Sequence, residues 1–243
     1  TVVKLDRKQP ENRITLEQYL ANTVTARRIR LGREALNDNK EMLADIRRRY
    51  NVQPEYIVAL WGIETDYGNY TGNFSVVQSL ATLAYEGRRA DFFRGELLNA
   101  LRIIDRGDVG ADDMIGSWAG AMGNCQFMPS TYQNYAADGD GDGKRDIWNN
   151  EADVFASIAN YLHALGWNPN EGWGMVVSWP ETFEMEDANI HHARPLSEWV
   201  QIGLKDQEAN PLKSSDALRY AVFPGAPEDG LYLVTNNFKT ILQ

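Results

Sequence analysis

The sequence has a single cysteine, Cys125, so no disulfide can form within the chain and a small disulfide-stapled scaffold is excluded. Its apolar runs are only a few residues long, far below the roughly 20 residues that a membrane-spanning helix needs. No basic segment followed by an apolar one opens the chain, as a secretory signal would. We therefore expect a soluble chain whose N-terminus has already been processed or trimmed.

What is present points to a folded body of some size. The 243 residues are 43% apolar and 24% charged, which is enough to bury the core of one large or two modest domains. No internal repeat or low-complexity tract interrupts them.

The negative net charge is unevenly distributed. Residues 1–50 hold 12 Lys and Arg against 7 Asp and Glu, whereas the rest of the chain holds 12 against 27. The acidic part of the chain would repel the phosphates of a nucleic acid, and we therefore expect no nucleic-acid partner. A set of arginines in the basic part is typical of a solvated helix face, with docking of an anionic polymer as the alternative. The set comprises Arg27, Arg28, Arg30, Arg33 and Arg47–Arg49.

Apolar residues at helical spacing predict a largely helical chain up to about residue 168. Thr15 and Gln18 have the spacing of a capping box, which would start the first helix. The predicted helical segments are about 15–50, holding two or three helices, 54–68, 88–104 and 151–165. The expected buried stripe of the segment 88–104 is Phe93, Leu97, Leu101 and Ile104.

Beyond residue 168, repeated prolines break the chain into short pieces. Strand-like runs follow at 175–179, 217–223 and 231–235. The fold class is therefore mainly α with a smaller, partly β lobe. We expect an N-terminal helical region over 1–52, a helical core over 53–168, and a mixed α/β lobe over 169–243.

One carboxylate falls on a helix face that should be buried. On the helix that begins at Pro54, Glu64 shares a stripe with Ile57, Leu60 and Trp61. The negative end of the helix dipole and the exclusion of water beside Trp61 would both raise the pKa of Glu64. A carboxyl group that keeps its proton near neutral pH can protonate the oxygen of a leaving sugar. A partly buried structural glutamate is the alternative.

Four motifs, in order along the chain, extend this hypothesis. The motifs are Leu5-Asp-Arg-Lys-Gln-Pro-Glu11, Trp61-Gly-Ile-Glu64-Thr-Asp-Tyr-Gly68, Gly116-Ser-Trp-Ala-Gly-Ala-Met-Gly-Asn-Cys-Gln126-Phe-Met-Pro-Ser130-Thr-Tyr132 and Ala159-Asn-Tyr161-Leu-His-Ala-Leu-Gly166-Trp167. They resemble those of the B-type lytic murein transglycosylases of bacteria, and the resemblance covers nearly the whole chain.

The resemblance implies a goose-lysozyme-like helical core that cuts peptidoglycan between N-acetylmuramic acid (MurNAc) and N-acetylglucosamine (GlcNAc). It also implies that Glu64 is the only catalytic carboxylate. Turn or core hydrogen-bonding roles are the alternatives for the polar residues that it assigns to substrate binding, and plain core packing for the aromatic ones. These matched positions are Ser117, Gln126, Phe127, Tyr161 and Tyr19.

Such a reaction needs one carboxylate, whereas a hydrolase needs a second at about 5–5.5 Å or 6.5–9.5 Å from the first. Glu64 would protonate the leaving oxygen and then accept the proton of the MurNAc 6-hydroxyl. This hydroxyl attacks its own anomeric carbon, and tethering supplies the proximity. Asp66 points to another helix face and is a poor second carboxylate. An ordinary muramidase that uses water is the nearest alternative.

A second motif predicts a calcium site. The run Asp138-Gly-Asp140-Gly-Asp142-Gly143-Lys-Arg-Asp146 has acids at positions 1, 3, 5 and 9 of an EF-hand loop and glycine at position 6. Position 12 is Asn149 rather than glutamate. In the family that the chain resembles, an aspartate fifteen residues after the first closes the loop. We expect structural Ca²⁺ and no organic cofactor, with a solvated acidic turn as the alternative. The ligands would be Asp138, Asp140, Asp142, the backbone carbonyl of Lys144, and Asp153.

The resemblance implies peptidoglycan glycan strands as the partner and hence a periplasmic location. We expect a monomer. An outer-membrane anchor on a longer natural form stays open, and the chain ends at Gln243 before further groove residues that the resemblance implies. A non-catalytic, calcium-dependent wall-binding module is the alternative of a different class.

Overall fold

The computed structural model describes residues 1–8 and 15–243. The first of the four motifs therefore lies outside the described residues from Gln9 onward. The described residues form two compact units, one of residues 1–8 and 23–164 and the other of residues 15–22 and 165–243. The division of the chain into three parts at residues 52 and 168 stays a prediction.

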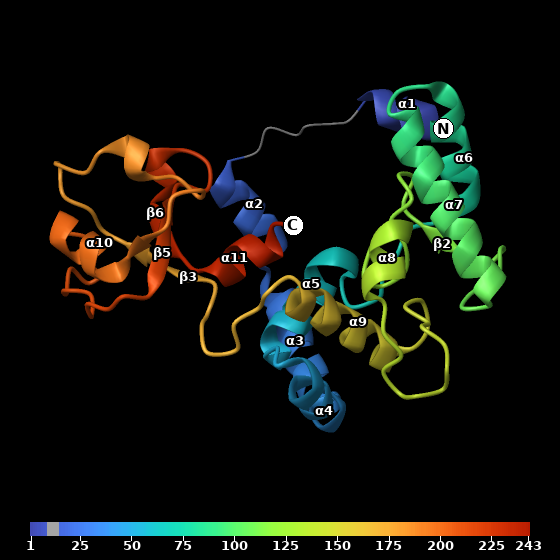
Figure 1. Ribbon diagram of the computed structural model, residues 1–243, viewed down its shortest axis with the longest axis horizontal. Helices are drawn as coiled ribbons and strands as arrows, with labels where there is room; N and C mark the ends of the chain where they lie inside the picture. Colours follow the sequence, from blue (N-terminus) through green and yellow to red (C-terminus); the bar gives the residue numbers. More distant parts are fainter. Residues whose placement is uncertain (9–14) are drawn as a thin grey trace. The chain divides into compact units, whose positions relative to one another are not determined.

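The first unit is built mainly from helices (Figure 1). Two short strands, β1 (Phe74–Ser75) and β2 (Ile115–Gly116), pair antiparallel within it. Its helices are α1 (Val2–Lys8), α3 (Ala26–Asp38), α4 (Lys40–Tyr50), α5 (Pro54–Thr65), α6 (Val76–Glu86), α7 (Ala90–Arg106), α8 (Pro129–Tyr135) and α9 (Glu151–Ala164).

Helix α9 lies at the centre of this unit, because every residue from Ala152 to Ala159 is buried. It packs against α4, α5 and α8. A helix that is buried on all sides is the expected result when neighbouring helices surround it. Helices α6 and α7 lie side by side, and α1 packs against α6 (Figure 1).

The predicted buried stripe of α7 is confirmed at Phe93 and wrong at Leu101. The buried residues are Phe93, Glu96, Ala100 and Ile103, whereas Leu101 is 45% exposed. Glu96 can be buried because its Oε2 accepts the backbone N–H of Ser130 at 2.8 Å, at the start of α8. A polar residue with a distant partner thus replaces leucine on the buried face. Helices α6 and α8 were also not predicted from the sequence.

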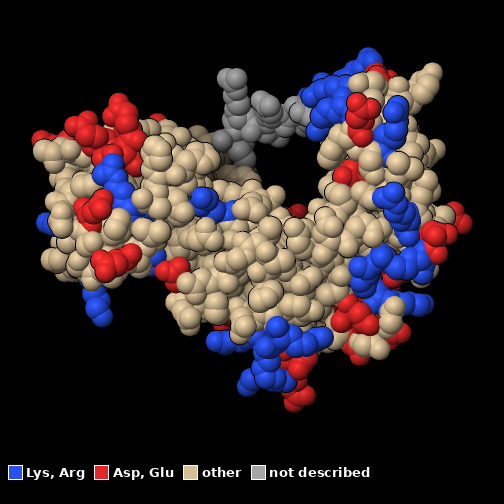
Figure 2. All heavy atoms as spheres, in the orientation of Figure 1, with Lys and Arg blue, Asp and Glu red and all other residues tan. Residues whose placement is uncertain are grey.

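Basic side chains gather over α3 and α4 (Figure 2). Several of these arginines form ion pairs with acids of the same helix: Arg30 with Glu34, and Arg48 and Arg49 with Asp45. Exposed pairs of this kind contribute little to stability. This surface therefore matches the interpretation as a solvated helix face.

The second unit contains a four-stranded antiparallel sheet in the order β3-β6-β5-β4. The capping box is confirmed at the start of α2, because the Thr15 N–H donates to Gln18 Oε1 and the Gln18 N–H to Thr15 Oγ1. The elements are α2 (Leu16–Thr23, in this unit up to Asn22), β3 (Gly174–Val177), the 3-10 turn η1 (Met185–Asp187), β4 (Arg194–Pro195), α10 (Leu196–Ile202), β5 (Leu218–Val222), the 3-10 turn η2 (Pro227–Asp229), β6 (Leu231–Val234) and α11 (Asn236–Ile241).

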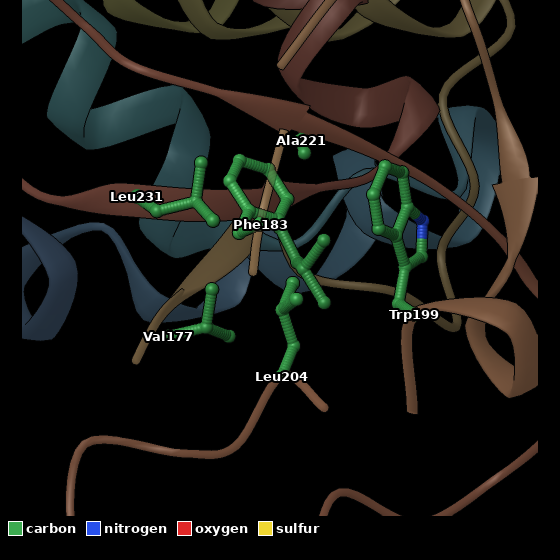
Figure 3. Packing of buried hydrophobic residues seen from close by; sticks show 7 residues of the cluster. Val177, Phe183, Trp199, Leu204, Ala221 and Leu231 are labelled. Carbon is green, nitrogen blue, oxygen red and sulfur yellow. The ribbon is translucent and has the colours of Figure 1, made fainter. Parts of the chain in front are cut away.

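One face of the sheet carries the core of the second unit. Leu231 and Leu233 point to the same side because side chains alternate along a strand, and Val177 and Ala221 are their partners on the neighbouring strands. The core cluster also includes Phe183, Trp199 and Leu204 (Figure 3).

Within residues 1–8 and 15–243, every helix is too short or too polar to cross a membrane.

Candidate active site

Helix α5 carries the candidate acid in its last turn. The helix begins with Pro54 at its first position, where the missing N–H is not needed, and ends before Asp66 in the left-handed conformation. Its buried face includes Ile57, Trp61 and Thr65. Glu64 is exposed at the edge of this face, so the prediction that it lies on the buried stripe is off by one residue.

The environment of Glu64 nevertheless favours the protonated acid. Desolvation by the surrounding protein raises the pKa of Glu64, in the predicted direction. No hydrogen bond or ion pair reaches its carboxylate from the part of the chain that the structure describes, and desolvation is the cause of its raised pKa. Glu64 thus combines access to solvent with an increased affinity for its proton, which a general acid requires.

The turn after Glu64 is fixed by contacts with α3. Asp66, Tyr67 and Gly68 all have positive φ angles, which is uncommon for the first two residue types. Arg27 Nη1 lies 2.8 Å from both carboxylate oxygens of Asp66, and the Tyr67 hydroxyl donates to the carbonyl of Arg28 at 2.8 Å. Asp66 is therefore occupied by an arginine, which agrees with its rejection as a second catalytic carboxylate.

Trp61 connects α5 to the motif that contains Gln126. Its indole N–H donates to Asn124 Oδ1 at 2.9 Å, and its ring meets those of Tyr67 and Phe155 edge to face. Burial, and after it the charge of Glu64, raises the pKa of the Cys125 thiol. The segment around Cys125 therefore lies close to Glu64, and its buried thiol is not activated as a nucleophile.

Ser117 lies in a tight loop after β2. Its backbone N–H donates to the carbonyl of Ala121 at 2.8 Å. Its Oγ accepts the N–H groups of Ala119 at 3.3 Å and Ala121 at 3.0 Å. Both side-chain bonds use the oxygen as acceptor, so the hydroxyl proton is the group that could meet a substrate.

Gln126 is half-buried and has a positive φ of 48°. Its Nε2 donates to the carbonyls of Thr71 at 3.1 Å and Gly123 at 2.9 Å. Both amide hydrogens are used in this way, and Oε1 remains to accept a bond from a sugar hydroxyl. A constrained backbone of this kind is often found at functional sites.

Two predicted aromatic residues meet in space. The ring centroids of Phe127 and Tyr161 are 5.5 Å apart, and Tyr135 packs edge to face on Tyr161 at 5.1 Å. Phe127 is buried and Tyr161 is half-buried. Burial, and after it Tyr135, raises the pKa of the Tyr161 hydroxyl, so it stays a neutral phenol.

Tyr19 lies on α2 within the second unit, and 48% of its surface is exposed. Its place in a binding groove stays a prediction.

The aspartate loop brings three carboxylates together. Asp138, Asp140 and the fully buried Asp153 each offer an oxygen, and these oxygens lie within 4.8 Å of one another. The oxygens of Asp153 accept the N–H groups of Gly139 at 2.7 Å and Asp146 at 2.6 Å. Three hard oxygen donors at this spacing suit Ca²⁺. Burial raises the pKa of Asp153, so a cation would relieve an unfavourable charge there.

The other two expected ligands lie outside this group of three carboxylates. Asp142 is exposed, and its Oδ1 accepts the N–H of Lys144 at 2.8 Å. Asn150 Nδ2 donates to Asp140 Oδ2 at 2.8 Å, a contact that the sequence did not indicate. The part played by Asp142 and by the Lys144 carbonyl stays a prediction.

Comparison with known proteins decides the family. The family described as Transglycosylase SLT domain matches residues 1–243, the whole chain. The chain belongs to this family. This membership confirms the resemblance to lytic murein transglycosylases that the motifs indicated.

Individual members of the family give the same result. The membrane-bound lytic murein transglycosylase B of Escherichia coli (strain K12) is 37% identical over 151 residues, which are 62% of this chain and 42% of that protein. SltB3 of Pseudomonas aeruginosa, solved in complex with NAG-anhNAM-pentapeptide, is 44% identical with a TM-score of 0.96, over 99% of this chain and 65% of that one. The chain therefore spans less than two thirds of the length of these two relatives.

A third family member is the lytic transglycosylase Slt35 of Escherichia coli, solved in complex with calcium. It is 30% identical with a TM-score of 0.81, over 99% of this chain and 75% of that one. These similarities confirm the mainly helical, lysozyme-like fold.

Proposed function

We propose that this SLT-domain chain is the catalytic part of a lytic transglycosylase. It cleaves the β-1,4 bond between MurNAc and GlcNAc of peptidoglycan and leaves a 1,6-anhydro-MurNAc end. The observation that carries the proposal is Glu64, a solvent-accessible carboxyl group with a raised pKa in the last turn of a helix that is buried on one face. Neighbouring motifs and family membership support it.

Glu64 acts first as acid and then as base. Its carboxyl group donates a proton to the glycosidic oxygen, and the bond to the anomeric carbon breaks with its electron pair on the leaving GlcNAc. The carboxylate then accepts the proton of the MurNAc 6-hydroxyl, whose oxygen bonds to the same carbon. Glu64 regains its proton and no water is consumed. Because the nucleophile is tethered to the substrate, no second carboxylate is needed.

The remaining site residues hold the sugars. Gln126 Oε1 accepts a hydrogen bond from a sugar hydroxyl, because the amide hydrogens already bond to the carbonyls of Thr71 and Gly123. The Ser117 hydroxyl donates to Glu64 or to an N-acetyl group. Phe127 and Tyr161 present aromatic surface to pyranose rings, and Tyr19 is a further sugar-binding residue.

Calcium supports this site without touching the substrate. Asp138, Asp140 and Asp153 provide side-chain oxygens, and Asp142 and the Lys144 carbonyl complete the ligand set. The ion neutralises carboxylates that otherwise repel one another. A relative solved with calcium supports this assignment.

Because peptidoglycan is the substrate, the protein acts in the periplasm of a bacterial cell envelope. It acts as a monomer. A relative named as membrane-bound is consistent with an outer-membrane anchor on a longer form of this protein.

Digestion of purified peptidoglycan sacculi tests the proposal. We compare the wild type with Glu64→Gln and with Glu55→Gln, an exposed glutamate in the first turn of the same helix. The wild type and Glu55→Gln should release fragments with anhydro ends, each one water lighter than the hydrolytic product. Glu64→Gln should release none while keeping its fold. Equal release by Glu64→Gln, or fragments with reducing ends, would overturn the proposal; reducing ends would indicate a muramidase.

A further inference from the structure

Asn124 lies between the aspartate loop and the catalytic helix. It is 8% exposed and belongs to neither set of predicted site residues. We propose that Asn124 is a positioning residue that links occupation of the aspartate loop by calcium to the end of α5 that carries Glu64. The inference rests on the calcium site and the role of Glu64 proposed above.

Three residues around Glu64 contact Asn124. The Trp61 indole N–H donates to Asn124 Oδ1 at 2.9 Å, and the Thr65 hydroxyl lies 3.4 Å from the Asn124 carbonyl. A side chain added at Gly68 would place its Cβ 2.7 Å from Asn124 Oδ1, so the turn after Glu64 also passes close to this oxygen. Asn124 therefore touches α5 three residues before Glu64, one residue after it, and again at the turn.

The opposite side of Asn124 holds the end of the aspartate loop. Its Nδ2 donates to the carbonyls of Ile147 at 3.2 Å and Trp148 at 2.9 Å, and its backbone N–H donates to Ile147 at 2.8 Å. The residue before Ile147 is Asp146, whose N–H donates to Asp153 Oδ2 at 2.6 Å. One peptide unit and one hydrogen bond thus separate the Ile147 carbonyl, which Asn124 contacts, from the predicted calcium ligand Asp153.

The amide of Asn124 has only one orientation that satisfies its neighbours. Its oxygen faces an N–H donor and its nitrogen faces two carbonyl acceptors. A flipped amide would place donor against donor and acceptor against acceptor. Because the group is buried and fully bonded, a shift of the loop carbonyls is transmitted to the indole of Trp61.

By thermodynamic linkage, the coupling between calcium binding and the position of Trp61 acts in both directions. If ordering of the loop by calcium favours the present position of Trp61, then holding Trp61 must favour calcium binding by the same factor. Removing the link should weaken calcium affinity about two- to ten-fold, the range expected for one net hydrogen bond.

The test compares Asn124→Leu with the wild type. Leucine keeps the branched shape and adds no charge near the loop. The matched control is Asn237→Leu in the second unit, where a buried asparagine also donates from Nδ2 to backbone carbonyls, those of Asn168 and Glu171. Calorimetric titration with CaCl₂ measures affinity. The NMR signal of the Trp61 indole N–H, assigned by its loss in Trp61→Phe, reports the transmitted shift.

Calcium should move the Trp61 indole signal in the wild type and in Asn237→Leu, but not in Asn124→Leu, whose affinity should fall by the stated factor. If Asn124→Leu does not fold, Trp61→Phe removes the donor at the other end of the bond, together with part of a buried ring, and should show the same fall. The inference is overturned if the wild type binds no calcium, or if calcium does not shift its Trp61 indole signal. It is also overturned if Asn124→Leu and Trp61→Phe both keep the calcium affinity of the wild type. Glycan cleavage is not part of this readout, so failure of the proposed reaction would appear separately, in the sacculus assay.

Discussion

Gly62→Ala tests whether the turn after Glu64 is packed as described. Gly62 lies on α5, and a Cβ there would meet the Tyr67 ring at 2.5 Å from Cζ and 2.6 Å from the hydroxyl oxygen. The ring cannot easily move aside, because a Cβ at Gly32 of α3 would lie 2.7 Å from the same hydroxyl, which also bonds to the Arg28 carbonyl. Overpacking costs about 1–3 kcal/mol. Replacing glycine within a helix returns about 0.5–1 kcal/mol. We expect a net loss of about 0–2.5 kcal/mol of unfolding free energy.

Gly95→Ala is the matched control. Gly95 lies within α7, and a Cβ there would meet no atom within 4 Å. This substitution should therefore stabilise the protein by about 0.5–1 kcal/mol. Chemical denaturation followed by circular dichroism measures both variants. The reasoning is refuted if Gly62→Ala is stabilised as much as Gly95→Ala, because the Tyr67 ring would then not occupy the space between α3 and α5.

Three further predictions follow from the same structure. Desolvation by the surrounding protein raises the pKa of Glu64, so its contribution to stability is present at low pH and is lost as the pH rises through the raised pKa. Glu64→Gln should therefore have a higher Tm than the wild type near neutral pH and an equal Tm well below the pKa of free glutamate; a lower Tm near neutral pH would contradict this sign. Chelation of calcium should lower the Tm, since a ligand of the folded state stabilises it, while the mass of the glycan product stays the same; an altered product would argue against a supporting role. Ile103→Ala should lower the free energy of unfolding by about 2–5 kcal/mol, whereas Leu101→Ala on the exposed side of α7 should lower it by less than about 1 kcal/mol in the same denaturation assay. Equal losses would support the buried stripe that was predicted from the sequence.

Local signals in the sequence were sufficient for many of the elements. Pro54 marks the start of α5, and the Thr15 and Gln18 capping box is formed as expected. The strands β5 and β6 lie within the predicted runs because alternation of buried and exposed side chains is a local property. The wrong stripe on α7 has the opposite origin, since burial of Glu96 depends on a backbone N–H 34 residues away.

In the candidate site, too, local sequence patterns predicted some residues, whereas residues that depend on distant contacts were missed. The spacing of the aspartates predicted Asp138 and Asp140 as ligands, and the resemblance to the family implied Asp153. The structure brings the oxygens of these three residues together. Asn124 was not identified, because its partner Trp61 is 63 residues away and nothing in the local pattern distinguishes it. The exposure of Glu64 was also missed, since a helical stripe cannot resolve which of two adjacent residues faces the core.

Digestion of sacculi in heavy-oxygen water tests the central claim most directly. If the 6-hydroxyl of MurNAc attacks after Glu64 has given up its proton, mass spectrometry should find anhydro ends that contain no label from the solvent. A labelled oxygen at the cleaved anomeric carbon would show that water is the nucleophile and would contradict the account.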